Sequence, residues 1–173
     1  MYYFISSGII VAALVLWIIT LQRRLMALEG NVRNAVLQIG IQLSSQWDAL
    51  ESLLSLAGEY MGPDEKAVVE TVKERHPVTK ASSTDDIARQ QKITWEITEK
   101  IIAIGEKHPE LMEDHGYTKT LNGVCQYENM VQTSSLIYNE SASKLNKTLR
   151  MFPNSLVTGI LGFDRRTYLD TNQ

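Results

Sequence analysis

The stretch GIIVAALVLWIITL, residues 8–21, decides the fold class of this chain. No charged side chain occurs from Tyr2 to Gln22. A helix needs about 20 apolar residues to cross roughly 30 Å of hydrocarbon, and this segment has that length. The sequence therefore predicts a transmembrane anchor over residues 1–22, which contacts membrane lipids through residues 2–22.

A cleavable signal peptide is the competing interpretation of the same segment. It requires a positively charged start, a shorter apolar core and a small-x-small cleavage site. Here no Lys or Arg precedes the apolar run, and the run continues directly into Gln22-Arg23-Arg24 without a cleavage signature. We therefore favour the anchor.

The positive charges indicate how the anchor is oriented. Arg23, Arg24 and Arg33 all follow the apolar segment, whereas its other side carries only the terminal amine. The positive-inside rule then predicts a single-pass protein of the cell (inner) membrane, with the N-terminus outside and the main domain in the cytoplasm. Gly8 and Ala12 form a small-xxx-small pair through which two such helices can pack closely.

Beyond the anchor, the apolar residues become periodic and predict a first domain helix over residues 25–61. They recur mostly every three or four residues, as expected for one buried stripe: Leu25, Leu28, Val32, Ala35, Ile39, Leu43, Leu50, Leu54 and Ala57. No proline occurs from residue 2 to residue 62, so this helix can continue directly from the anchor. Gly62-Pro63 ends it.

A second long helix is predicted over residues 116–151. Its stripe alternates steps of three and four, as in the a/d seam of a coiled coil: Leu121, Val124, Glu128, Val131, Ser135, Tyr138, Ala142, Leu145 and Leu149. Two interpretations of the polar members remain open. Glu128 and Ser135 meet water or partners in a layer that specifies register, or Glu128 is a functional carboxylate.

Two shorter helices are predicted between the long ones. The first covers residues 64–76. The second covers residues 85–107 and is capped by Ser83 or Thr84. No segment alternates with period two for long enough to form a strand. The fold expected is therefore all-α: an N-terminal transmembrane helix that continues into an antiparallel, coiled-coil-like bundle, with residues 23–173 as the helical domain.

If the second long helix returns along the first, the C-terminal segment 152–173 lies near the membrane. Residues 156–166 combine apolar side chains with Arg165 and Arg166, as interfacial elements do. This stretch either contacts lipid or only packs on residues 25–35 of the bundle. We favour packing.

Three stretches of the sequence carry a family resemblance. The first is NAVLQIGIQL at residues 34–43. The second is a set of residues at fixed spacing: Tyr138-Asn139, Asn146, Phe152-Pro153-Asn154-Ser155-Leu156 and Gly162-Phe163. The third is the loop His108-Pro109-Glu110-Leu111. With these motifs, residues 25–169 resemble the LemA family, whose members are membrane proteins with an N-terminal anchor and a helical domain.

The resemblance implies the all-α bundle and the anchor, and roles in organising membranes or in membrane-protein quality control. It implies no particular reaction. The chain departs from the family where Gly40 replaces a common acid, where Ser45 and Gln46 replace basic residues, and where Glu51 often has a proline counterpart. No binding role tied to those basic positions is therefore carried over to this chain.

Charge and cysteine content narrow the function further. The chain has 17 Lys and Arg residues against 20 Asp and Glu, without a basic block. Nucleic-acid binders usually concentrate basic residues on one face, so no nucleic-acid partner is expected. The single cysteine, Cys125, excludes an internal disulfide and is expected to pack as a small apolar residue.

The densest polar cluster runs from His108 to His115 and includes Glu110, Glu113 and Asp114. Imidazoles and carboxylates can bind metals, but the spacing that puts two ligands on one helix face is absent. Two hypotheses follow. The favoured one is a membrane-tethered interaction scaffold that binds protein partners or itself. The alternative is a membrane-surface, metal-dependent enzyme or factor that uses this loop. For the favoured hypothesis we assign no catalytic, cofactor-binding or metal residues and expect no small-molecule substrate.

Overall fold

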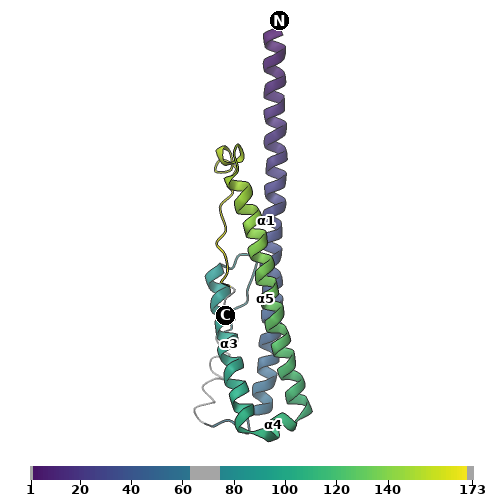
Figure 1. Cartoon of the computed structure of the whole chain (residues 1–173), viewed down its shortest axis with the longest axis vertical. Coiled ribbons are helices and arrows are strands. Elements are labelled where there is room, and N and C mark those ends of the chain that lie inside the picture. Colours follow the sequence, from purple (N-terminus) through teal and green to yellow (C-terminus); the bar gives the residue numbers. More distant parts are fainter. Residues whose placement is uncertain (1, 63–74, 171–173) are drawn as a thin grey trace.

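The computed structural model describes residues 2–62 and 75–170, and these residues form helices and irregular segments without any strand. The elements are α1 (Tyr2–Ala57), α3 (Thr84–Lys107), α4 (Pro109–Glu113), α5 (His115–Arg150) and the short 3-10 helix η1 (Asn154–Leu156). Figure 1 shows α3 and α5 lying alongside the lower part of α1, whose N-terminal part projects beyond them. The predicted all-α fold is confirmed.

The predicted anchor and the first domain helix are one continuous element. Helix α1 contains 56 residues, which corresponds to about 84 Å at 1.5 Å per residue. It ends at Ala57 rather than at residue 61 as predicted. Gly58 follows, and glycine disfavours helix by up to about 1 kcal/mol relative to alanine. The Tyr60 backbone N–H then donates to the Ala57 carbonyl in a turn.

The predicted helix 64–76 lies almost entirely outside the described residues. Its last two residues, Arg75 and His76, belong to the stretch 75–83, which is not helical and which we call the irregular segment. This segment passes very close to α1 at Gly40, where an added Cβ would lie 2.6 Å from the Val78 carbonyl oxygen. Gly40 is therefore required by packing, and only a glycine leaves room for this approach.

Local capping explains where the next helices begin. The Ser83 hydroxyl accepts from the Asp86 N–H, and the Asp86 carboxylate accepts from the Ser83 N–H, which is a complete capping box. Helix α5 begins after Asp114, whose carboxylate accepts from the Tyr117 N–H at 2.7 Å. The loop predicted between these helices contains α4 instead, because Pro109 is well suited to a first helical position.

Helices α1 and α5 run antiparallel and pack along the two predicted apolar stripes (Figure 1). The buried residues form two clusters along this pair. The proximal core, nearest the projecting part of α1, consists of Leu21, Leu25, Val32, Ala35, Val36, Ile39, Leu43, Ile87, Val131, Tyr138, Ala142, Leu145, Leu149 and Leu169. The distal core, nearest α4, consists of Trp47, Leu50, Leu53, Leu54, Ala57, Met61, Ile97, Ile101, Ile104, Leu111, Tyr117 and Val124.

The C-terminal segment packs on the bundle, as favoured from the sequence. After η1 the chain returns along α5, where the Asn146 side chain bonds both the N–H and the carbonyl of Arg166. Asn139 bonds the N–H and carbonyl of Leu169 in the same way. The Arg166 guanidinium also reaches Glu29 on α1 at 2.7 Å. These contacts join the segment to both long helices.

Candidate functional site

A band of polar side chains separates the two cores. On α1 the buried apolar stripe stops at Leu43 and resumes at Trp47, with the buried Gln46 between them. We call this band the polar layer, and it consists of Gln46, Gln90, Gln91, Thr94, Glu128 and Ser135. The two polar seam residues predicted from the sequence both belong to it.

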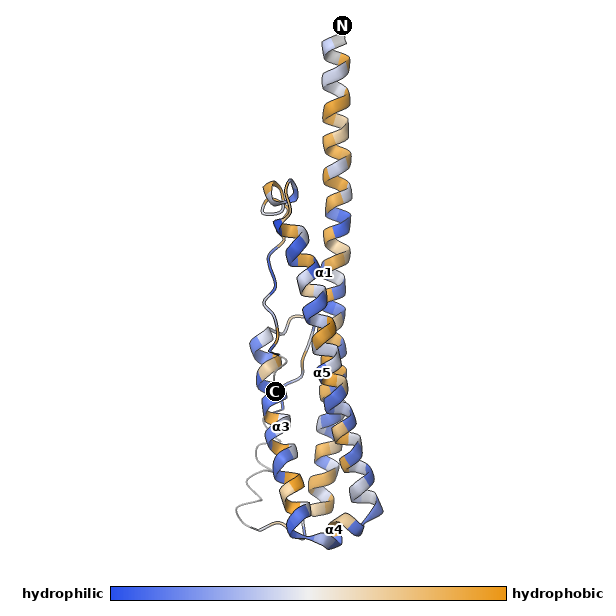
Figure 2. Cartoon of the chain, in the orientation of Figure 1, coloured by the Kyte–Doolittle hydropathy of each residue, from blue (hydrophilic) through white to orange (hydrophobic). Residues whose placement is uncertain are grey.

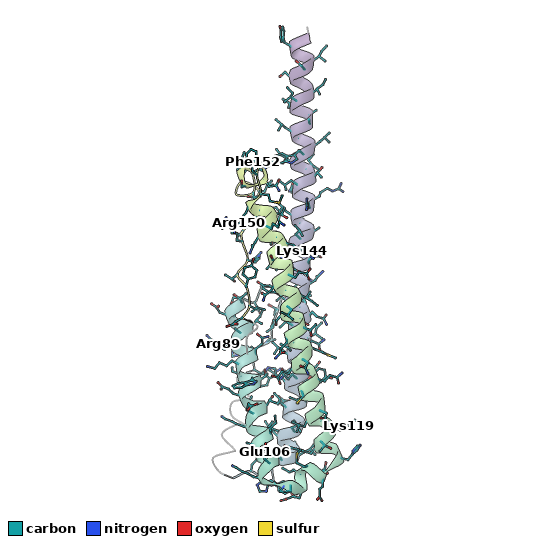
Figure 3. The ribbon with its side chains drawn as sticks, in the orientation of Figure 1. Arg89, Glu106, Lys119, Lys144, Arg150 and Phe152 are labelled. Atoms are coloured by element: carbon teal, nitrogen blue, oxygen red, sulfur yellow. The ribbon has the colours of Figure 1, made fainter. Side chains whose placement is uncertain are left out.

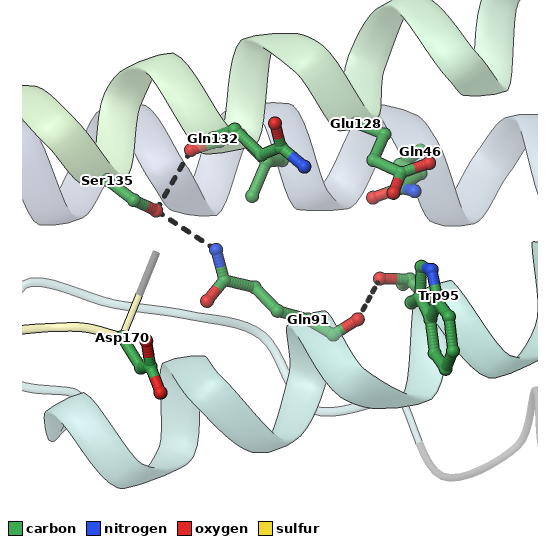
Figure 4. Close-up of a pocket in the computed structure, with 9 residues that line it drawn as sticks. Gln46, Gln91, Trp95, Glu128, Gln132, Ser135 and Asp170 are labelled. Carbon is green, nitrogen blue, oxygen red and sulfur yellow. Dashed lines mark hydrogen bonds between the residues drawn. The ribbon is translucent and has the colours of Figure 1, made fainter. Parts of the chain in front are cut away.

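A small pocket opens at the polar layer between α1, α3 and α5 (Figure 4). It has a volume of about 40 Å³, which is room for a few water-sized groups. Its lining includes Gln46 from α1, Gln91 and Trp95 from α3, and Glu128 from α5. Trp95 is 45% exposed, so the pocket has an aromatic side chain that solvent or a partner can reach.

Gln46 is the most unusual side chain in this pocket. It is 1% exposed, and neither its amide oxygen nor its amide nitrogen has a hydrogen-bond partner among the residues that the structure describes. Leaving a buried polar group unpaired costs about 1–3 kcal/mol. Gln46 therefore places an unpaired side-chain amide beside the pocket, with neither amide atom exposed to solvent.

Glu128, whose carboxyl group has a raised pKa, lines the same pocket. Burial raises the pKa of the Glu128 carboxyl above its usual value, and the negative charge of Glu99 raises it further. Burial, together with Glu128, also raises the pKa of the nearby Cys125 thiol. The half-buried Cys125 therefore has the character of a packed thiol, in line with the expectation from the sequence.

Hydrogen bonds in the polar layer connect α3 to α5. The Gln91 side-chain amide donates to the Ser135 hydroxyl at 3.0 Å, and that hydroxyl donates to the Val131 carbonyl (Figure 4). Gln90 accepts from the His76 backbone N–H at 3.1 Å, which ties the irregular segment to α3. The layer thus connects the irregular segment, α3 and α5, while Gln46 and Glu128 line the pocket and the Gln46 amide has no partner among the described residues.

Sequence reasoning did not find Gln46, Gln91 and Trp95 as members of one site. The available signal was the polar Gln46 between Leu43 and Leu50 on an otherwise apolar stripe. Periodicity identifies a polar residue within an apolar stripe, but it does not predict which residues of α3 lie opposite Gln46.

The loop from His108 to His115 does not assemble a metal site in the described residues. His108 Nδ1 lies 3.4 Å from Glu110 Oε1, and the His108 ring packs against Tyr60 with 5.4 Å between centroids. Within residues 2–62 and 75–170, no group of three or more His, Cys, Asp or Glu residues is arranged to hold a metal. The geometry adds no support to the metal-dependent alternative.

The projecting part of α1 is the second functional feature. Of its most apolar 18-residue window, 6% is buried inside the structure, and the helix is long and apolar enough to cross a membrane. Figure 2 shows this apolar stretch standing clear of the bundle. Only near its end do Trp17 and Leu21 contact the proximal core.

Comparison with known families identifies the bundle. The sequence profile of the LemA family matches residues 35–173, which include α3, α5, the C-terminal segment and most of the bundle part of α1. The chain belongs to the LemA family. The resemblance seen in its motifs is thereby confirmed. No curated protein matches this LemA-family chain.

Proposed function

We propose that this LemA-family protein is a single-pass membrane protein, with residues 2–22 of α1 in the inner membrane. The observation that carries the proposal is the exposed apolar part of α1, which has no packing partner in the described structure over most of its length. Exposed apolar surface of this extent is unfavourable in water. A bilayer removes it from water and also matches the helix in length.

We propose that the bundle lies on the cytoplasmic side. Arg23 and Arg24 are exposed at the point where the apolar stretch ends, and Arg33 follows between two and three turns further on, at about 3.6 residues per turn. The opposite end of the stretch has no Lys or Arg. By the positive-inside rule this asymmetry favours an outside N-terminus.

Substitutions inside the apolar stretch test the anchor. Val11→Arg combined with Val15→Arg places two charges at the centre of the predicted span, each of which costs about 2.5–3.5 kcal/mol there. Both side chains are exposed, so the bundle is expected to stay folded. Membranes washed at alkaline pH should retain the wild type and release the double variant.

The matched control is Gln22→Arg, which adds a charge where arginines already follow and should leave the protein in the membrane fraction. Circular dichroism of each variant checks that the bundle remains helical. If the double variant stays in the membrane as firmly as the wild type, residues 2–22 are not the anchor.

We propose that the bundle works as an interaction scaffold whose contact site is the pocket beside Trp95. Tryptophan is enriched at the centres of protein interfaces, and Trp95, which lines this pocket, is exposed enough for a partner to contact it. The partner is another protein or a second copy of this chain. Roles in membrane organisation or membrane-protein quality control fit such a scaffold.

A photo-crosslinking residue in place of Trp95 tests this contact site in cells. We expect protein adducts at position 95 and none at Lys92, an exposed position one turn earlier on the same helix. An adduct of two chains identifies self-association, and an adduct of another mass identifies a different partner. Equal yields at both positions would contradict the assignment of this site.

A further inference from the structure

We propose that the turn after α5 inserts into the lipid interface beside α1. We call residues 151–162 the apical turn. This inference rests on the proposed membrane anchor and adds a second lipid contact to it. The sequence left open whether this region contacts lipid or only packs on the bundle. In the structure some of its apolar residues pack on the bundle and others are exposed.

The position of the apical turn along α1 is the first observation. Val157 and Leu161 pack against the proximal core, as does Trp17 of the apolar stretch. Leu21, the last apolar residue before Arg23 and Arg24, belongs to that core. The apical turn therefore lies at the level where the apolar stretch of α1 ends (Figure 1). A bilayer that surrounds the stretch has its interface at this level.

The large exposed side chains of the apical turn are apolar. Phe152 is 80% exposed, Leu156 67% and Ile160 86%, although all three belong to types that are usually buried. No charged residue occurs from Met151 to Phe163. Figure 3 shows Phe152 at the end of the bundle from which α1 projects, with Glu106 and Lys119 towards the other end.

The backbone of the apical turn is compatible with a poorly hydrated environment. Polar backbone groups near hydrocarbon need partners within the protein. Many of those in the turn have them, because N–H groups from Ser155 to Phe163 donate to carbonyls between Met151 and Gly159. Gly162 has φ +74°, a left-handed conformation that favours glycine and reverses the chain towards α5.

Basic side chains flank the apical turn. Arg150 precedes it on α5, Arg165 follows it, and both are exposed, as are Arg23 and Arg24 on α1. Arginines at this depth can contact anionic lipid headgroups while the apolar side chains beside them reach the acyl chains. This arrangement favours a lipid surface over a protein partner as the occupant.

The turn is held in place without lipid. Asn146 bonds both backbone groups of Arg166 just beyond it, and Arg166 reaches Glu29 on α1. Phe152, Leu156 and Ile160 are therefore presented by a preformed element, and no folding step is needed when the membrane meets them.

Fluorescence quenching in vesicles tests the inference with the full-length chain. In a Cys125→Ser background, Ile160→Cys is labelled with the fluorophore NBD, and the protein is reconstituted in phosphatidylethanolamine and phosphatidylglycerol vesicles. We expect a blue-shifted emission that acyl-chain-bound nitroxides quench and aqueous iodide does not. The exposed Met112→Cys on α4, at the far end of the bundle, is the matched control and should be quenched by iodide alone.

A third label, at Leu14→Cys, separates this inference from the proposed anchor. Quenching by nitroxides at both 14 and 160 supports both. Quenching by nitroxides at 14 with quenching by iodide at 160 overturns the lipid contact of the apical turn and leaves the anchor standing. Quenching by iodide at both positions overturns both.

Discussion

Gly40 lies where the irregular segment passes so close to α1 that no side chain fits. A methyl group there would lie 2.6 Å from the Val78 carbonyl oxygen, which belongs to the backbone and cannot rotate away. Overpacking of this kind costs about 1–3 kcal/mol. Gly40→Ala should therefore lower the free energy of unfolding by an amount in this range, measured by chemical denaturation in detergent.

Gly30→Ala is the control for that experiment. Gly30 also lies within α1, but nothing lies within 4 Å of the position that its Cβ would occupy. Alanine is the better helix former, so this substitution should raise stability by up to about 1 kcal/mol. Equal effects of the two substitutions would show that residue 78 does not approach α1 at Gly40.

Glu128 is predicted to make stability depend on pH. Its folded-state pKa is raised above the usual 4.5, first by burial and then by Glu99. As pH rises through 4.5 the unfolded chain loses this proton first, so the folded state binds more protons and stability falls until pH passes the raised pKa. Glu128→Gln removes this loss, and its stability relative to wild type should increase from pH 4 to pH 7 in denaturation curves.

Glu99→Gln should act in the same direction but less strongly, because the charge on Glu99 is the second of the two causes. The Glu128→Gln variant still fills the pocket, so packing is preserved. Parallel stability curves for wild type and Glu128→Gln across this pH range would contradict the raised pKa.

Among the elements, the returning C-terminal segment depends on two asparagines of α5. Asn146→Ala removes both bonds to the Arg166 backbone, and Asn139→Ala removes both bonds to the Leu169 backbone. Leaving such groups unpaired costs about 1–3 kcal/mol. We expect faster hydrogen exchange at the Arg166 amide in the first variant and at the Leu169 amide in the second.

Ser143→Ala is the matched control for these variants. Ser143 is exposed on α5 between the two asparagines, so its loss should leave the exchange of both amides unchanged. Unchanged exchange in the asparagine variants as well would mean that the segment is held by its apolar contacts rather than by these side chains.

The same elements show what the sequence predicts well. Helices α3 and α5 begin within one residue of the prediction because their caps, Ser83 and Asp114, act locally. The stripes of α1 and α5 are confirmed because periodicity reports burial on one helix face. The approach of Val78 to Gly40 was not predicted, because it depends on a contact between segments 38 residues apart.

The roles of Asn139 and Asn146 were missed for a similar reason. Both occur in glycosylation-like triplets inside a helical pattern, which suggests no structural role. Their bonds reach 30 and 20 residues along the chain, to a segment without periodicity of its own. Only the family resemblance, whose closing motif includes both asparagines, pointed to them. The pocket is lined by residues from three helices. The periodicity of one helix does not predict which residues of the other two lie opposite it.

At the scale of the whole molecule, one continuous helix joins the predicted membrane segment to the bundle. The bundle part of α1, from residue 22 to residue 57, extends roughly 50 Å at 1.5 Å per residue. The distal core and α4 therefore lie far from the proposed bilayer, while the proximal core and the apical turn lie at its surface. The pocket beside Trp95, the proposed contact site, lies between these ends.

The orientation of the chain in the membrane tests this account most directly. In a Cys125→Ser background, single cysteines replace Tyr3, which is 89% exposed near the N-terminus, and Met112 on α4. Spheroplasts are treated with a membrane-impermeant maleimide before and after permeabilisation. We predict labelling at position 3 in intact spheroplasts and at position 112 only after permeabilisation. Labelling at both positions in intact spheroplasts, or at position 112 alone, would contradict an anchor that holds the bundle in the cytoplasm.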